Sequence, residues 1–143
     1  MQVNFNSALR AKGYSVTKSR QIVFSTLLRE GALSIRALVQ ITEDSLDRAS
    51  VYRTVRLFEE LGFIRRITIG WKYKIELSDI FTHHHHHITC DSCGLVTDLE
   101  DDARLEHALG AMTRTIGFSN LHHEVEIRGI CQACQKNGAP VKN

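Results

Sequence analysis

The chain has 143 residues, of which 43% are hydrophobic and 24% charged, with a formal net charge of +2. This length suits one domain or two small ones, and the apolar content is sufficient for a buried core, which excludes wholesale disorder. No apolar run approaches the roughly 20 residues of a transmembrane helix, and no secretory signal is recognisable, so we expect a cytoplasmic protein without a membrane partner.

Four short helices are expected in the first half, followed by a hairpin. Thr17 and Ser34 are suitable N-caps for the second and third helices, and Gly31 and Gly62 end the second and fourth. Apolar alternation around Gly70 is typical of a two-stranded hairpin. The predicted helices cover residues 5–12, 18–30, 35–41 and 48–61, and the hairpin residues 67–77. Helices followed by such a hairpin predict a winged helix-turn-helix.

The second half is expected to form strand, strand, helix and strand, at residues 82–89, 95–99, 105–116 and 123–128. The residues after Cys134 are polar and are expected to fray. The prediction is therefore an α/β (α+β) chain with an N-terminal winged-helix domain, a small C-terminal α/β domain and a tail. Their expected bounds are 1–80, 81–136 and 137–143.

Charge and metal-ligand residues are unevenly distributed between the two halves. Residues 1–81 contain 13 Lys and Arg against 8 Asp and Glu, whereas residues 82–143 contain 5 against 8. All eight histidines and all four cysteines follow residue 82. This division favours a nucleic-acid-binding half and a metal-binding half, although charge alone supports DNA binding only weakly.

Two Cys-x-x-Cys pairs enclose most of the second half. Reduced cytosolic thiols in two such pairs offer the four thiolates that zinc prefers in closed structural sites. The sequence therefore predicts a structural Zn²⁺ that joins the two ends of this domain, with a redox dithiol as the alternative. The four residues are Cys90, Cys93, Cys131 and Cys134.

Five consecutive histidines, residues 83–87, precede the first cysteine pair. On a strand, His84 and His86 would face one way and the other three the opposite way, so one strand could supply two metal sites. A nonspecific chelating loop is the alternative. Mixed imidazole and carboxylate ligands suit Fe²⁺, Mn²⁺, Co²⁺, Ni²⁺ or Zn²⁺. The further ligands are expected among Glu76, Asp98, Glu100, Asp101, Asp102, Glu106, His107, His122 and His123.

The predicted fourth helix has one apolar side and one side rich in basic and hydroxyl groups, as a DNA recognition helix requires. A solvated helix with ordinary surface charges is the alternative. The polar side carries Arg48, Ser50, Tyr52, Arg53, Thr54 and Arg56. Flanking phosphates could be contacted from the hairpin by Arg65, Arg66, Lys72 and Lys74.

Over about residues 5–134 the chain resembles the ferric uptake regulator superfamily of bacterial metal-dependent repressors. The matching stretches are residues 13–20, 49–54, 84–94 and 129–134, and the His–Cys block at 84–94 is the most specific. The resemblance implies a homodimer whose winged helices bind a palindromic DNA operator and whose C-terminal domains pair.

The resemblance also implies roles for particular residues. The four cysteines fall on the structural zinc ligands of the family. A site within the dimerisation domain would use His84, His86, Glu106 and His123. A regulatory site at the hinge between the domains would use Glu76, His85, His87 and Asp98. Tyr52 and Arg53 fall where the family's helix meets DNA, and Lys18, Arg20, Ser50 and Arg56 complete the expected contacts.

Two departures from the iron-sensing members bear on the metal. Ala32 stands where these members usually have a histidine ligand, and His86 stands where they have an aspartate. The second change favours metals that prefer nitrogen ligands. We expect a metal-dependent transcriptional repressor controlled by Fe²⁺ or Zn²⁺, with Mn²⁺ or Ni²⁺ as further candidates and peroxide sensing as an open alternative. A zinc-dependent hydrolase and a metal-storage protein are the alternatives.

Overall fold

The computed structural model describes residues 3–69, 72–100, 102–119, 123 and 125–138. The chain divides into two compact units, residues 1–83 and 84–143. The hairpin turn expected at Gly70, the candidate ligands Asp101 and His122, and the tail from residue 139 lie outside the described residues. Among the described residues, no helix is both long and apolar enough to cross a bilayer.

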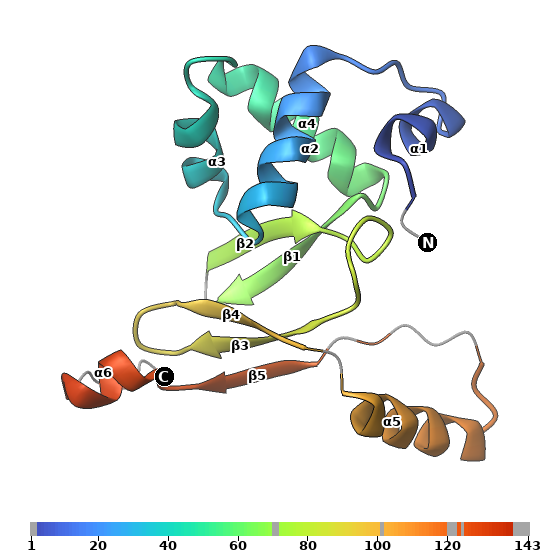
Figure 1. The fold of residues 1–143 in the computed structure, drawn as a ribbon, viewed down its shortest axis with the longest axis vertical. Coiled ribbons are helices and arrows are strands. Elements are labelled where there is room, and N and C mark those ends of the chain that lie inside the picture. Colours follow the sequence, from blue (N-terminus) through green and yellow to red (C-terminus); the bar gives the residue numbers. More distant parts are fainter. Residues whose placement is uncertain (1–2, 70–71, 101, 120–122, 124, 139–143) are drawn as a thin grey trace. The chain divides into compact units, whose positions relative to one another are not determined.

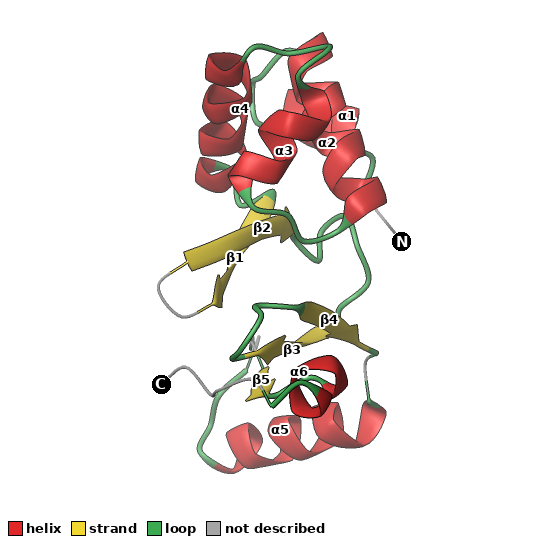
Figure 2. Cartoon of the chain, turned by 90° about the vertical axis from the view of Figure 1, so that its left-hand side faces the viewer, coloured by secondary structure: helices red, strands yellow, loops and turns green. Residues whose placement is uncertain are grey.

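The described part of unit 1 forms the predicted winged helix, with helices gathered on one side of a hairpin (Figures 1 and 2). Asp47, which the sequence analysis did not identify as a cap, accepts a hydrogen bond from the Ser50 N–H at 2.9 Å. The elements are α1 (Phe5–Ala11), α2 (Lys18–Glu30), α3 (Ile35–Thr42), α4 (Arg48–Glu60), β1 (Ile64–Ile69) and β2 (Lys72–Leu77).

Phenylalanines form much of the core of unit 1. Phe5 of α1 stacks on Phe24 of α2 with ring centroids 4.1 Å apart. Phe81, after β2, meets Phe63 edge to face at 5.0 Å. Phe58 of α4 completes the cluster and is fully buried. Since these rings come from α1, α2, α4 and both ends of the hairpin, their burial fixes the helices against the wing.

The segment before α3 extends the hairpin by one antiparallel bridge. The Leu33 N–H donates to the Ile75 carbonyl at 2.9 Å, and the Ile75 N–H donates to the Leu33 carbonyl at 2.7 Å. In antiparallel geometry the residue before Leu33 opposes the residue after Ile75. Ala32 therefore corresponds in register to Glu76, one of the predicted metal ligands.

Unit 2 contains a three-stranded sheet in the order β4-β3-β5 (Figure 1). β4 is antiparallel to β3, and β5 is parallel to it. A parallel neighbour requires a long crossover, which contains α5. The elements described in unit 2 are β3 (His86–Cys90), β4 (Val96–Leu99), α5 (Ala103–Thr115), β5 (Glu126–Gly129) and α6 (Gln132–Lys136).

Two elements of unit 2 differ from the sequence prediction. β3 begins at His86 instead of Thr82, because β4 ends at Leu99, which is the partner of His86 in the register. Gln135 and Lys136 belong to α6 and are not frayed, and the helix also includes the buried Cys134. A helix of five residues is too short to leave a recognisable apolar period in the sequence.

The described residues of unit 2 bury no large apolar side chain. Its buried residues are His86, His87, Thr89, Cys90 and Cys134. Met112 of α5 and Ile116, directly after it, are 68% and 71% exposed, and no residue of this helix is buried. A unit of this size without an apolar core depends on additional stabilisation, of which metal binding and subunit association are the usual forms.

Candidate metal centres and DNA-binding surface

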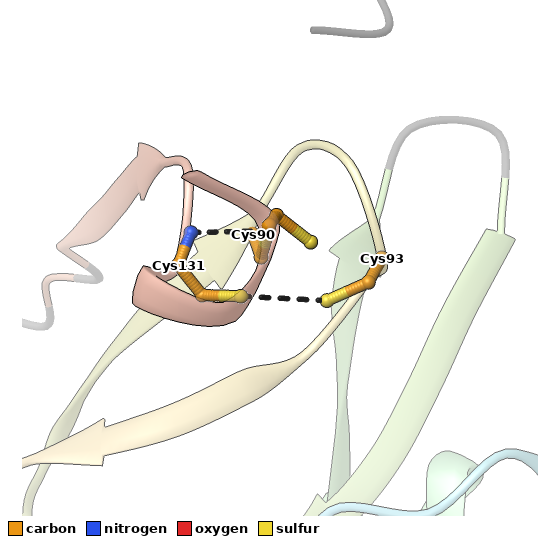
Figure 3. A group of neighbouring side chains, drawn as sticks. Cys90, Cys93 and Cys131 are labelled. Carbon is orange, nitrogen blue, oxygen red and sulfur yellow. Dashed lines mark hydrogen bonds between the residues drawn. The ribbon is translucent and has the colours of Figure 1, made fainter. Parts of the chain in front are cut away.

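The four cysteine sulfurs converge in unit 2, all within 4.8 Å of one another. Cys90 ends β3, and the turn to Cys93 is followed by Gly94, whose φ of +73° is in the left-handed region that favours glycine. Cys131 precedes α6, and Cys134 lies within it. Figure 3 shows the side chains of Cys93 and Cys131 pointing toward each other.

The spacing of the sulfurs fits a zinc ion. Four ligands at the usual Zn–S distance of about 2.3 Å in a tetrahedron are about 3.8 Å apart. The Sγ atoms of Cys93 and Cys131 are separated by 3.8 Å. All four cysteines are free thiols and form no disulfide, so each could provide a thiolate.

The thiols differ strongly in acidity. The backbone N–H of Cys131 donates to Cys90 Sγ at 3.3 Å, and this bond is the main reason that the pKa of Cys90 falls to about 6. A hydrogen bond with Ser92 lowers the pKa of Cys134, but hydrogen bonds with Cys131 and burial outweigh it and raise that pKa to about 12. One sulfur thus ionises easily and another only with difficulty. Four neighbouring thiolates require a cation between them.

A second cluster joins His84, His86 and His123 to Glu106 of α5. The Nε2 atoms of His86 and His123 lie 3.1 and 3.0 Å from Glu106 Oε1, and that of His84 lies 3.7 Å away. Tetrahedral ligands at about 2.0–2.1 Å from a metal would be roughly 3.4 Å apart, so these spacings fit a metal site. All four ligand atoms lie within 4.8 Å of one another.

Glu106 is held in its ionised form. Burial alone raises the pKa of this carboxyl, but hydrogen bonds with His123 and His86 outweigh that effect, and the pKa lies below its ordinary value. An ionised carboxylate surrounded by imidazole nitrogens is a donor set suited to a divalent transition metal.

The alternate histidines form a separate group within unit 2. His85 and His87 have ring centroids 4.8 Å apart, and His87 Nε2 is 3.5 Å from Asp98 Oδ1. His87 and Asp98 are direct partners in the register of β3 and β4. The structure therefore brings together three of the four residues predicted for the hinge site, and it separates them from His84 and His86.

Glu76, the fourth residue predicted for that site, belongs to β2 in unit 1. It is only 4% exposed and accepts a hydrogen bond from Arg65 Nε at 2.5 Å. Arg65 and Glu76 are direct partners across the hairpin. Arg65 was a candidate for contact with DNA phosphate, but its side chain is 18% exposed and also pairs with Asp79. Arg65 is therefore largely engaged within unit 1.

The exposed side of α4 carries most of the residues predicted to contact DNA, but Thr54, which was expected on that side, is only 5% exposed and its hydroxyl donates to the Ser50 carbonyl at 2.9 Å. Tyr52, Arg53 and Arg56 are exposed, while Val51 on the opposite side is fully buried. Arg53 Nη2 donates to Ser50 Oγ at 2.9 Å. Arg56 forms an exposed ion pair with Glu60.

Two predicted contacts lie at the start of α2. Lys18 is exposed. Arg20 donates to the Ser15 carbonyl, and its guanidinium lies 5.5 Å from the centre of the Tyr14 ring. Arg48 of α4 makes a contact that was not predicted: its guanidinium lies 5.4 Å from the centre of the Tyr52 ring. Arg48 and Tyr52 are four residues apart, and this spacing brings two side chains of a helix side by side, so the sequence contained a signal for their contact.

The model of the ferric uptake regulator family matches residues 11–128, most of the chain. The chain belongs to the ferric uptake regulator family. Members of this family are metal-responsive transcriptional regulators that bind DNA and form dimers. The chain is accordingly a transcription regulator and not an enzyme, which removes the hydrolase and storage alternatives.

Individual relatives agree with this assignment. The peroxide-responsive repressor PerR of Staphylococcus aureus is 29% identical over 133 residues, covering 90% of this chain and 88% of the relative. The ferric uptake regulator of Vibrio cholerae is 26% identical, with a TM-score of 0.72 over 90% of this chain and all of the other. The Pseudomonas aeruginosa regulator solved with manganese has 24% identity and a TM-score of 0.76, covering 91% and 99% of the two chains.

Proposed function

We propose that this regulator binds a palindromic DNA operator as a homodimer and represses transcription in the cytoplasm when a divalent metal is bound. The observation that carries the proposal is the sorting of neighbouring histidines into two clusters, each with a carboxylate. Such sorting is expected of a chain built to bind metal at defined positions, and a nonspecific chelating loop would not require it.

The cysteine cluster is proposed to hold structural Zn²⁺. A bound Zn²⁺ would supply the positive charge that neighbouring thiolates need. Cys90 and Cys93 would then be tied to Cys131 and Cys134, so that the turn after β3 and the start of α6 remain together. This role is supported by the absence of buried large apolar side chains among the described residues of unit 2.

Homodimer formation through unit 2 is supported by its exposed apolar side chains. Met112, Ile116 and Phe118, on α5 and just after it, are 68%, 71% and 64% exposed. Burial of such side chains against a second copy would contribute roughly 25 cal/mol for each Å² of apolar surface removed from water. Association would thus stabilise a unit that has little core of its own.

Two further metal sites are proposed, with Fe²⁺ or Zn²⁺ as the main candidates and Mn²⁺ or Ni²⁺ as further ones. The site in the dimerisation domain is proposed to use His84, His86, Glu106 and His123. The regulatory site is proposed to use His85, His87 and Asp98 of unit 2 with Glu76 of unit 1. The distances between the side chains support the assignment of the unit 2 residues as ligands. The assignment of Glu76 is supported by the family resemblance.

DNA is proposed to bind at α4 and the start of α2, through Ser50, Tyr52, Arg53, Arg56, Lys18 and Arg20. Ligands from both units at the regulatory site would restrict how far the two recognition helices of a dimer can move. The helices fit successive major grooves only at a spacing of roughly 34–36 Å, so this restriction would raise DNA affinity. By linkage, DNA would raise metal affinity by the same factor.

The regulatory site is tested with the His85→Ala/His87→Ala double variant. We expect it to fold, to dimerise and to retain zinc, but to lose the gain in DNA affinity that Mn²⁺ gives the unsubstituted protein. Gel shifts with and without Mn²⁺ measure this gain. Both proteins should bind less tightly as salt rises, because lysine and arginine contacts to phosphate release counterions.

A matched control is His107→Ala, which removes an exposed histidine of α5 outside the clusters. It should respond to Mn²⁺ as the unsubstituted protein does. If the double variant retained the full metal response, regulation through His85 and His87 would be wrong. If chelator left the DNA affinity of the unsubstituted protein unchanged, metal-dependent binding itself would be wrong.

A further inference from the structure

An ion pair connects the two cysteine turns of unit 2. Asp91 immediately follows Cys90, and Arg128 lies three residues before Cys131. Arg128 Nε and Nη2 donate to Asp91 Oδ1 at 2.8 and 2.5 Å. The Asp91 side chain is 18% exposed and that of Arg128 is 43% exposed. The pair therefore lies at the edge of the cysteine cluster, where solvent screens it only in part.

Backbone contacts make the same connection. The Asp91 N–H donates to the Gly129 carbonyl at 2.8 Å, and the Cys131 N–H donates to Cys90 Sγ at 3.3 Å. The first cysteine turn is thus attached to the chain that leads from β5 into the second pair. Of these three contacts, the ion pair is the one that involves two side chains and can be removed by substitution.

The charge balance gives the pair a second effect. Zn²⁺ with four thiolates carries a net charge of about −2, and the Asp91 carboxylate adds another negative charge nearby. The guanidinium of Arg128 offsets that added charge. The carboxylate can therefore anchor the turn without increasing the repulsion that the thiolates experience.

We propose that Arg128 is a positioning residue for the cysteine metal site and that, through Asp91, it holds the two cysteine pairs in reach of one ion. The inference rests on the proposed zinc site and adds a residue that controls how long the ion is retained. Substitution of a residue that orients a metal ligand typically lowers metal affinity by about 10–100-fold. Since Arg128 acts through a partly exposed pair, we expect the lower end of that range.

The test measures the rate at which the zinc-loaded full chain releases Zn²⁺ to an excess of a chelating dye, at fixed pH and salt. Arg128→Gln should release zinc about tenfold faster than the unsubstituted protein. Arg128→Lys should fall between the two, because its ammonium retains the charge but not the fork of donors. Arg128→Lys also provides the comparison if Arg128→Gln fails to fold. Equal rates for all three proteins would overturn the inference.

Asp91→Ala separates positioning from a general charge effect. If Arg128 acts through Asp91, Asp91→Ala should also release zinc faster, and the double variant should be no faster than the faster single one. If Arg128 acted only by its charge, removal of the Asp91 carboxylate would slow release or leave it unchanged. Either of those results would overturn positioning through Asp91.

Arg104→Gln is the matched control, because Arg104 pairs with Asp102 in the same unit but lies at the start of α5, which contains no cysteine. Its release rate should equal that of the unsubstituted protein, and an equal acceleration would contradict a local role for Arg128. Cys93→Ser tests the underlying site. Unchanged zinc content in that variant would show that the proposed zinc site is wrong, independently of Arg128.

Discussion

At the scale of single residues, Arg65 stabilises the wing by neutralising a buried carboxylate. Glu76 is 4% exposed and bonds Arg65 across the hairpin. Arg65→Gln removes this cation and leaves a buried charge less well compensated, so we expect a loss of about 1–3 kcal/mol in the free energy of unfolding. Urea denaturation measures it. Arg66→Gln, whose side chain is 54% exposed and pairs with Glu59, should cost at most about 1 kcal/mol.

Ala32 offers a test of the regulatory site at the same scale. It corresponds in register to Glu76, because Leu33 bridges Ile75. Ala32→His would place an imidazole next to a proposed ligand, and we expect it to tighten Mn²⁺ binding roughly tenfold, or about 1.4 kcal/mol. Isothermal titration of the zinc-loaded protein measures the change. Ala32→Gln is the control, and equal affinity in all three proteins would indicate that Glu76 is not a ligand.

The candidate ligands are easier to recognise in the sequence than the residues around them. Cysteine pairs and a histidine run are local patterns whose chemistry is evident from spacing alone. The contact between Arg128 and Asp91 depends on how β5 pairs with β3, which no short pattern specifies. Arg65 was expected to contact phosphate because its partner in the structure, Glu76, is eleven residues away. This partner can be recognised only once the register of the hairpin is known.

At the scale of elements, α4 begins with a cap that depends on pH. Hydrogen bonds from the Ser50 hydroxyl and backbone N–H hold the pKa of Asp47 below its ordinary value of 3.8. A lowered folded-state pKa means that the carboxylate stabilises α4 above pH 3.8 and loses this effect as pH falls further.

Asp47→Asn retains a capping oxygen but does not titrate. We expect the variant to be less stable than the unsubstituted protein at pH 6, and the difference to vanish as the pH falls below about 3.8. Urea midpoints at several pH values measure the difference. Asp44→Asn, outside the cap, should show no such trend. A constant difference between the Asp47 variant and the unsubstituted protein at all pH values would contradict the ionic contribution.

The helices of unit 1 could be predicted because each has a local signal: caps at Thr17 and Ser34 and a terminating glycine such as Gly31. The start of β3 could not be predicted, because a strand ends where its partner strand ends. The partner of His86 is Leu99, which is thirteen residues away in the sequence. α6 was not predicted because a helix of five residues is too short to leave a recognisable apolar period. Local sequence signals therefore predict which helices and strands form, whereas pairing in the tertiary structure decides where they begin and end.

At the scale of the whole molecule, the two units should respond differently to removal of zinc. Unit 1 has a cluster of buried phenylalanines, whereas the described part of unit 2 buries no large apolar side chain. We expect Cys93→Ser to abolish zinc binding at the cysteine site and dimer formation. Metal analysis and sedimentation measure these losses. A dimer that persists without zinc would show that the apolar surface of unit 2 suffices for association. Cys93 is the exposed member of the four cysteines, so its substitution disturbs packing least.

The alternation of the histidines assigns each ligand position to one of two metal centres. Neighbouring residues of one extended segment supply opposite faces, so the parity of a position decides which ion it meets. Because five histidines stand in a row, deleting one ahead of β3 would move the upstream histidines one place along, and an imidazole would still occupy every ligand position. The repeat therefore buffers both centres against the loss of one residue, whereas substituting a single histidine at an odd or an even place removes a ligand from one centre alone.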